Sequence, residues 1–311
     1  MLGRIPRRRP RALTLPLIAA LMAACGGPDA PSSAAPIQVT DDAGRTVRLQ
    51  APAARVLSLI PAQTEAVRTL AGPGALVART RWDTDPALAH LPVTQDALTP
   101  SVEWIVAQAP DLVIAWADAD ARSVVGRLEA VGIPVYAARV ETLAEVDATL
   151  RRLGLLLGRQ ARADSLRAAI AADHAAVREA VAGREVPSVL YVVGTAPPTV
   201  AGPGTYVDEL ITLAGGRNVF HDARRPWPQV GMEAVVARAP DVVLIVRDRP
   251  PADPAAALAA LPGWRALGAV REGRVVALDA DVFNRPGVRV GEAARLLAEA
   301  LHPGALAGGL P

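Results

Sequence analysis

Ser101-Val-Glu-Trp-Ile-Val-Ala-Gln-Ala-Pro-Asp111 is followed at once by the apolar run Leu112-Val-Ile-Ala-Trp116. The first stretch has the pattern of a short helix that Pro110 ends, because the residue before a proline is disfavoured in helical backbone. The run after it is continuous and apolar, which is typical of a strand in a parallel sheet covered on both faces. Together they indicate one helix–strand step of an α/β fold.

The same step occurs again 130 positions further along the chain. Gly231-Met-Glu-Ala-Val-Val-Ala-Arg-Ala-Pro-Asp241 is identical to residues 101–111 at six of eleven positions, and the apolar run 242–246 follows it. Pro240 would end the second helix as Pro110 ends the first. The repeat predicts two lobes built to one design.

Further apolar runs alternate with helical patterns around these two steps. We expect strands at 56–60, 75–78, 112–116, 135–138, 189–193, 242–246 and 275–278. Between the two groups, residues 141–182 have helical periodicity, with a break expected near Gly154, Gly158 and Gln160. A β-hairpin with its turn at Asp42-Ala43-Gly44 precedes the first lobe.

The predicted fold class is therefore α/β, with two α/β lobes of mostly parallel sheets joined by a long rigid helix and preceded by a short β-hairpin. The expected boundaries are 1–24 for a lipoprotein signal peptide, 25–36 for a flexible tether, 37–50 for the N-terminal hairpin, 51–140 for the N-terminal lobe, 141–183 for the interlobe helix and 184–311 for the C-terminal lobe.

The first 25 residues have the three parts of an export signal. Basic residues up to Arg11 are followed by the apolar stretch 13–22 and then by small residues before Cys25. Cys25 is the single cysteine of the chain, so it has no internal disulfide partner. The segment Leu21-Met22-Ala23-Ala24-Cys25 resembles a lipobox, which predicts that Cys25 is lipidated. An ordinary signal peptide with an incidental cysteine is the alternative.

Charge and motifs argue against several classes of protein. The 33 basic and 31 acidic residues become 28 and 31 without the five arginines that precede Cys25, a net charge of −3 that does not suit nucleic acid binding. Every basic residue is Arg, which excludes Walker-type phosphate loops and Schiff-base chemistry. The four histidines have no ligand spacing, and no nucleophile is paired with a base. We therefore expect no metal, no cofactor and no catalytic activity.

Three tryptophans lie where a predicted strand or helix gives way to a loop. Trp116 ends a strand, and ligands of open α/β sheets bind beyond the carboxyl ends of strands. Trp227 stands between two prolines, which hold its backbone extended, and Trp82 follows the strand at 75–78. Each ring alone could simply fill apolar space at the edge of a lobe. Three of them, divided between two lobes, favour a shared aromatic cleft.

Four stretches resemble the class of bacterial periplasmic binding proteins that serve ABC importers for cobalamin, ferric siderophores and haem. They are residues 55–65, 82–86, 103–116 and 222–230 with Glu233. Within this class the chain looks most like the cobalamin-binding branch. The resemblance implies a monomeric, lipid-anchored protein on the periplasmic side of the cell envelope, held to the membrane only through Cys25. It would capture a corrinoid between its lobes and deliver it to a permease dimer with ATPase subunits.

The resemblance also implies roles for individual residues. Trp116 and Trp227 match aromatic positions that contact the corrin, and Arg81 or Trp82 occupies the region of a contacting tyrosine. Asp281 and Arg285 match a polar loop that reaches the ligand. Glu103 and Glu233 match two surface glutamates that dock onto arginines of the permease subunits, although each would also complement its own helix dipole.

Two departures keep other ligands and functions open. Ala97 and Val193 stand where the branch has aromatic residues, so the predicted pocket is less aromatic. A ferric-siderophore or haem binder would gather arginines in the cleft, and the candidates are Arg79, Arg81, Arg224, Arg225, Arg285 and Arg289. An enzyme on a related two-lobe fold, or a sensor that no longer binds a ligand, are the remaining alternatives.

The lipid anchor is tested by replacing Cys25 with Ser. Because the serine hydroxyl does not accept the lipid, the variant should move from the membrane fraction to the soluble fraction of fractionated cells. If Cys25→Ser still sediments with membranes after a high-salt wash, Cys25 does not carry the anchor.

Overall fold

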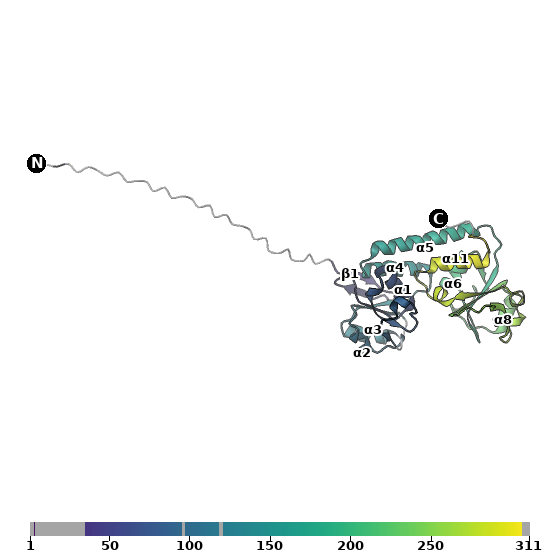
Figure 1. The fold of residues 1–311 in the computed structure, drawn as a ribbon, viewed down its shortest axis with the longest axis horizontal. Helices are drawn as coiled ribbons and strands as arrows, with labels where there is room; N and C mark the ends of the chain where they lie inside the picture. Colours follow the sequence, from purple (N-terminus) through teal and green to yellow (C-terminus); the bar gives the residue numbers. More distant parts are fainter. Residues whose placement is uncertain (1–2, 4–34, 95–96, 118–120, 307–311) are drawn as a thin grey trace. The chain divides into compact units, whose positions relative to one another are not determined.

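Two five-stranded sheets carry the fold of the described part of the chain (Figure 1). The computed structural model describes Gly3 and residues 35–94, 97–117 and 121–306, so the predicted signal peptide and Cys25 lie outside it. From Ala35 onward the chain forms one compact unit. No helix among these residues has the length and apolar character needed to cross a bilayer.

The first sheet has the order β5-β4-β3-β6-β7, and all of its strand pairs are parallel. Its strands are β3 (Val56–Ser58), β4 (Leu76–Thr80), β5 (Val93–Thr94), β6 (Leu112–Trp116) and β7 (Val135–Ala138). Successive residues of β6 alternate between two cores, with Leu112 and Ile114 in one and Val113 and Ala115 in the other. This sheet is therefore covered on both faces, as its continuous apolar strands predict.

Helices supply the two covering layers of the first lobe. α1 (Pro61–Ala71) and α4 (Leu143–Leu156) share a core with Leu112 and Ile114. α2 (Val102–Ala107) and α3 (Ala121–Ala130) share the core on the other face. The hairpin of β1 (Ile37–Thr40) and β2 (Thr46–Leu49) is antiparallel, as predicted, and contributes to the core that contains α1 and α4.

The second lobe repeats this arrangement. Its sheet has the order β10-β8-β11-β12, with β9 paired antiparallel to β8. The strands are β8 (Ser188–Thr195), β9 (Pro198–Val200), β10 (Arg217–Asn218), β11 (Val242–Arg247) and β12 (Val275–Asp279). One face packs on α6 (Tyr206–Leu213), α10 (Ala280–Phe283) and α11 (Val290–Leu301), and the other on α7 (Met232–Arg238), α8 (Pro254–Ala259) and α9 (Gly268–Arg271). The α/β class is confirmed.

The predicted helical segment 141–182 contains two helices. α4 ends at Leu156, and α5 runs over Gln160–Val181. Two glycines shape this junction, Gly158 by ending the helical backbone and Gly154 by letting α5 pack closely on α4. Gly158 has a φ of +62°, and a Cβ at Gly154 would lie 2.6 Å from the Cβ of Ala163 on α5. The longer helix, α5, spans the lobes, with Ala163 in the first-lobe core and Val177 and Val181 in that of the second (Figure 1).

The sequence repeat is also a repeat of local geometry. Ala109 and Ala239 both adopt positive φ, at 48° and 42°, and both precede the proline that ends the helix. Asp111 then accepts hydrogen bonds from the backbone N–H groups of Ala54 and Arg55, at 2.9 and 3.0 Å. Asp241 accepts equivalent bonds from the backbone N–H and hydroxyl of Ser188, at 2.8 and 2.6 Å. Each aspartate thus fixes the start of its strand to the strand beside it.

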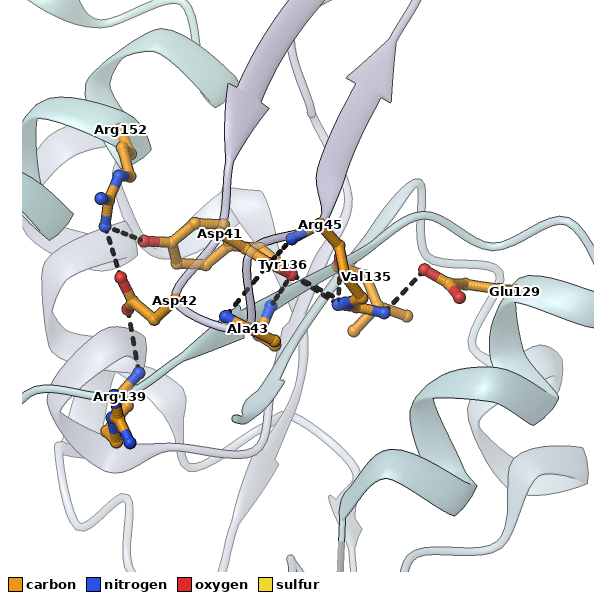
Figure 2. A network of polar contacts seen from close by, with 10 residues as sticks. Asp41, Asp42, Ala43, Arg45, Glu129, Val135, Tyr136, Arg139 and Arg152 are labelled. Carbon is orange, nitrogen blue, oxygen red and sulfur yellow. Dashed lines mark hydrogen bonds and ion pairs between the residues drawn. The ribbon is translucent and has the colours of Figure 1, made fainter. Parts of the chain in front are cut away.

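Asp41 fixes the N-terminal hairpin to the first lobe. Its side chain is fully buried and accepts hydrogen bonds from the backbone N–H groups of Ala43 (3.0 Å), Arg45 (2.8 Å) and Ala137 (3.2 Å). The guanidinium of Arg45 completes the set at 2.6 Å (Figure 2). Because Ala137 belongs to β7, the turn of the hairpin is bonded directly to the sheet.

Asp42 makes a second connection from the same turn (Figure 2). Its carboxylate accepts from Arg152 on α4 at 2.5 Å and from the backbone N–H of Arg139 at 2.9 Å. Arg45 also reaches Glu129 on α3 at 2.8 Å. The hairpin is therefore joined by polar contacts to a strand and to two helices of the lobe.

We expect Asp41→Ala to lower the free energy of unfolding by about 2–3 kcal/mol, because it leaves several buried donors and a partly buried Arg45 without their acceptor. Urea denaturation monitored by circular dichroism measures the change. Asp147→Ala is the matched control. This carboxylate is 51% exposed and paired with Arg167, so its loss should cost about 0–1 kcal/mol. Equal costs for the two changes would contradict the structural role of Asp41.

Candidate ligand-binding cleft

A cleft of about 730 Å³ lies between the two lobes. The first lobe lines it with the start of α1, the loop after β4 and the ends of β6 and β7. The second lobe contributes the loop after β11 and the segment that begins after β12. All the strands named here are parallel, so the cleft lies at their carboxyl ends, where open α/β sheets bind ligands.

Trp116 and Trp82 give the cleft two aromatic surfaces. Trp116 ends β6, where its ring is half-buried against the first-lobe core. Trp82 stands in the loop after β4 and is 52% exposed. The guanidinium of Arg81 lies 4.8 Å from the centre of the Trp82 ring, a cation–π contact that covers part of its face. Ile60, Ala138 and Val140 add apolar surface to the same cavity.

A buried aspartate shapes the loop that presents Arg81 and Trp82. Asp83 is 4% exposed and accepts a 2.6 Å hydrogen bond from the backbone N–H of Thr80. The hydroxyl of Thr80 in turn accepts from the backbone N–H of Trp82 at 3.1 Å. Burial raises the pKa of Asp83, although these hydrogen bonds oppose the shift. The turn that carries both cleft residues is therefore held from inside the lobe.

Asp281 and Arg285 cross from the second lobe to that same loop. They form an ion pair at 2.6 Å, and Arg285 donates to the backbone carbonyl of Trp82, also at 2.6 Å. The hydroxyl of Thr84 donates to Asp281 at 3.1 Å. These contacts connect the two rims of the cleft. They also leave Asp281 and Arg285 with much of their charge already compensated.

A second cavity of about 400 Å³ shares Pro61, Thr84, Asp281 and Arg285 with the cleft. Its other charged lining residues are Glu65, Arg68, Asp83, Asp85 and Arg289. Arg68 pairs with Asp85 at 2.9 Å, and Arg289 pairs with Glu292 at 2.7 Å. Burial raises the pKa of Glu65, against the effect of the nearby arginines. The charges of this cavity are thus balanced within the protein.

The structure brings together five of the residues singled out in the sequence. Arg81, Trp82, Trp116, Asp281 and Arg285 all line the cleft. Ala97 and Val193 are partly buried and do not line it.

Trp227 has a different position. It packs on the second-lobe core, with its ring centre 6.5 Å from that of Tyr206, and it is not among the residues that line the cavity. The backbone N–H of Tyr206 bonds to the carbonyl of Glu141, so this ring pair lies beside the junction of the lobes. A ligand contact by Trp227 stays a prediction.

Sequence reasoning did not single out five polar lining residues, which are Gln63, Thr84, Asp248, Arg249 and Asn284. Gln63 lies inside the stretch 55–65, two positions after Pro61, the first residue of α1. A polar residue just beyond the carboxyl end of a parallel strand is a signal that could have identified it. Asp248 and Arg249 follow β11 and could have been identified in the same way.

Glu103 and Glu233 are exposed in the first turns of α2 and α7, away from the cleft lining. Ser101 caps α2 and donates to Glu103 at 2.7 Å, which lowers the pKa of this carboxyl. Gly231 provides no such cap for α7, so the local environments of the two glutamates differ. Each is followed three residues later by an exposed valine, at 106 and 236.

Within the described residues, no group of three or more His, Cys, Asp or Glu side chains is placed to hold a metal ion. The cleft also has no described pairing of a nucleophile with a histidine base, since its lining includes neither Ser, Cys nor His. Its geometry is that of a binding cavity with an apolar aromatic surface and a polar rim.

Comparison with known proteins gives a consistent result. The profile of the periplasmic binding protein family matches residues 56–282. The chain is 30% identical over 249 residues to the vitamin B12-binding protein of Salmonella typhimurium, covering 80% of this chain and 90% of that one. The periplasmic vitamin B12-binding protein of Vibrio cholerae superposes with a TM-score of 0.68 at 27% identity, over 80% and 97% of the two chains. The periplasmic haem-binding protein of Roseiflexus sp. RS-1 gives 0.71 at 29%, over 81% and 98%.

Proposed function

Because the chain belongs to the periplasmic binding protein family, we propose that it captures cobalamin or a related corrinoid in the interlobe cleft and delivers it to the permease of an ABC importer. The observation that carries this proposal is the composition of the cleft. Two tryptophans and several aliphatic side chains line it, and its charged groups are nearly balanced. The B12-binding proteins at about 30% identity support the same ligand class.

The apolar part of the cleft suits a flat macrocycle. Trp82 and Trp116 offer large, rigid surfaces, which give apolar contact at low cost in conformational entropy. A cavity of about 730 Å³ is in the range of small-molecule sites, and its open side leaves room for a ligand to extend beyond it. Both features fit haem as well as a corrin. The charge of the residues that line the cleft must therefore decide between these two ligands.

The charge of the cleft favours a neutral ligand. Of the six arginines that could gather around an anionic siderophore or haem, only Arg81 and Arg285 line the cleft. Arg285 is paired with Asp281. With Asp248 and Arg249, the lining has three arginines and two aspartates. A corrinoid with amide side groups needs no cationic cluster, whereas the carboxylates of haem do.

Calorimetric titration of the purified protein tests the proposal. The ligands are cyanocobalamin, dicyanocobinamide, haem and a ferric hydroxamate siderophore. We expect both corrinoids to give saturable binding heat with one site per protein. Heat from the siderophore or haem alone would overturn the corrinoid assignment and leave a different ligand within the same family.

The aromatic residues are tested in the same titration. Trp116→Ala and Trp227→Ala should each weaken corrinoid binding by about 1–3 kcal/mol, the usual cost of removing a buried aromatic contact at a binding hot spot. Trp104→Ala is the control, because Trp104 is half-buried on α2 and does not line the cleft. Unchanged affinity in both the Trp116 and the Trp227 variant would mean that these rings only fill the edges of their lobes.

The membrane anchor and the permease contact complete the proposal. Lipidation of Cys25 would hold the protein at the periplasmic side of the cell envelope as a monomer, and the permease dimer with its ATPase subunits would be its partner. The internal repeat supports this contact, because it puts an exposed glutamate at the same place on each lobe. A transporter with two equivalent subunits offers one site for each. Such exposed charges set encounter rate and orientation more than affinity.

We expect Glu103→Ala/Glu233→Ala to bind its ligand normally but to lose stimulation of transporter ATPase activity and uptake in reconstituted vesicles. Glu179→Ala/Glu185→Ala is the matched control, since it removes two exposed glutamates elsewhere. Normal stimulation by the Glu103/Glu233 variant would leave these residues only their interaction with the helix dipole.

A further inference from the structure

We propose that Gln63 is a specificity-determining residue, which bonds an amide side group of the ligand and thereby selects amide-bearing macrocycles over carboxylate-bearing ones. This inference rests on the proposed binding of a corrinoid. Gln63 is 2% exposed, yet it lines the interlobe cleft. Among the described residues no side-chain hydrogen bond involves Gln63, and its amide is not one of the fully enclosed polar atoms, so it faces the cleft.

An unpaired amide at such a position calls for an explanation. Most buried polar side chains in folded proteins are hydrogen-bonded, because an unpaired one has lost water without compensation. The protein could have placed an apolar residue here, since Ala62 and Ala66 on the same helix are buried in the first-lobe core. Gln63 is instead kept where its amide faces the cleft, so that water or a bound ligand can pair with it.

The neighbouring polar groups are already engaged. The hydroxyls of Ser58 and Thr64 both donate to the carbonyl of Ile60, at 3.0 and 3.2 Å. Asp281 and Arg285 are paired with each other on the second-lobe side of the cleft. Pro61 has no N–H to offer a ligand. At the start of α1, Gln63 is therefore the side chain with free donor and acceptor capacity.

The chemistry of a glutamine amide decides which ligand group it suits. Its NH₂ donates and its carbonyl accepts, so another primary amide can satisfy both at once. A carboxylate can accept from the NH₂ but offers no hydrogen to the carbonyl, and its charge would lie beside a carbonyl oxygen. Corrinoids carry amide side groups around the ring, whereas the side groups of haem that could reach a polar residue are carboxylates.

The experiment compares Gln63→Met with the wild-type protein. Methionine keeps the length of the side chain and is apolar, so the fold should survive, which a thermal melt verifies. We expect cyanocobalamin and dicyanocobinamide to bind about tenfold more weakly, equivalent to the loss of one well-made hydrogen-bonded contact. Haem binding should change less than twofold. Gln160→Met, the same change at an exposed residue of α5, should alter no affinity.

The outcomes separate this inference from the proposed function. Wild-type protein that binds neither corrinoid overturns the proposed function, whatever the variant does. Wild-type protein that binds both, with Gln63→Met binding them equally well, overturns only the role of Gln63. An equal loss for corrinoids and haem would show a general effect on the cleft and would overturn the selection between amide and carboxylate.

Discussion

Parallel pairing of neighbouring strands is the constraint on which the binding site depends. In each lobe the long strands run in one direction, so the segments that follow them leave the sheet at the same edge. Loops far apart in the sequence, such as those after β4, β7 and β12, thereby reach a single cavity. No separate helix or strand is required to form the cleft, because it lies where the carboxyl-terminal edges of the two sheets meet.

α5 connects the two similar lobes by packing into both of their cores. Its first half is buried with the core of the first lobe through Ala163, and its last turns are buried with that of the second through Val177 and Val181. Packing into two cores opposes bending, because a bend would open apolar surface at one end of the helix. The contacts of Arg285 and Asp281 with the loop that carries Trp82 add a second, polar connection at the rim.

The internal repeat shows which features of the lobe design are structural. Two features have the same role in both lobes. Ala109 and Ala239 adopt positive φ before the proline that ends each helix, and Asp111 and Asp241 fix the start of the next strand. The features that differ lie around them. Ser101 caps its helix where Gly231 does not, and β9 adds an antiparallel strand to the second lobe only. The common elements shape each lobe, and the variable ones distinguish the surfaces that each presents.

The sequence by itself determined the elements that depend on local pattern. Continuous apolar runs predicted seven strands of the two sheets, and the repeated Ala-Pro-Asp predicted two related lobes. Strands β5, β9 and β10 escaped prediction, because none of these two- or three-residue strands is a continuous apolar run. The tertiary structure alone decided which polar side chains share the cleft. Gln63 looks like an ordinary helix residue in the sequence, and only packing shows that it is buried and open to the cavity. In the same way, the six arginines near the predicted loops could have formed a cluster, whereas the folded chain brings only two of them to the cleft and pairs one with Asp281. Which loops meet at the cleft is decided by strand order and packing, which local sequence patterns do not show.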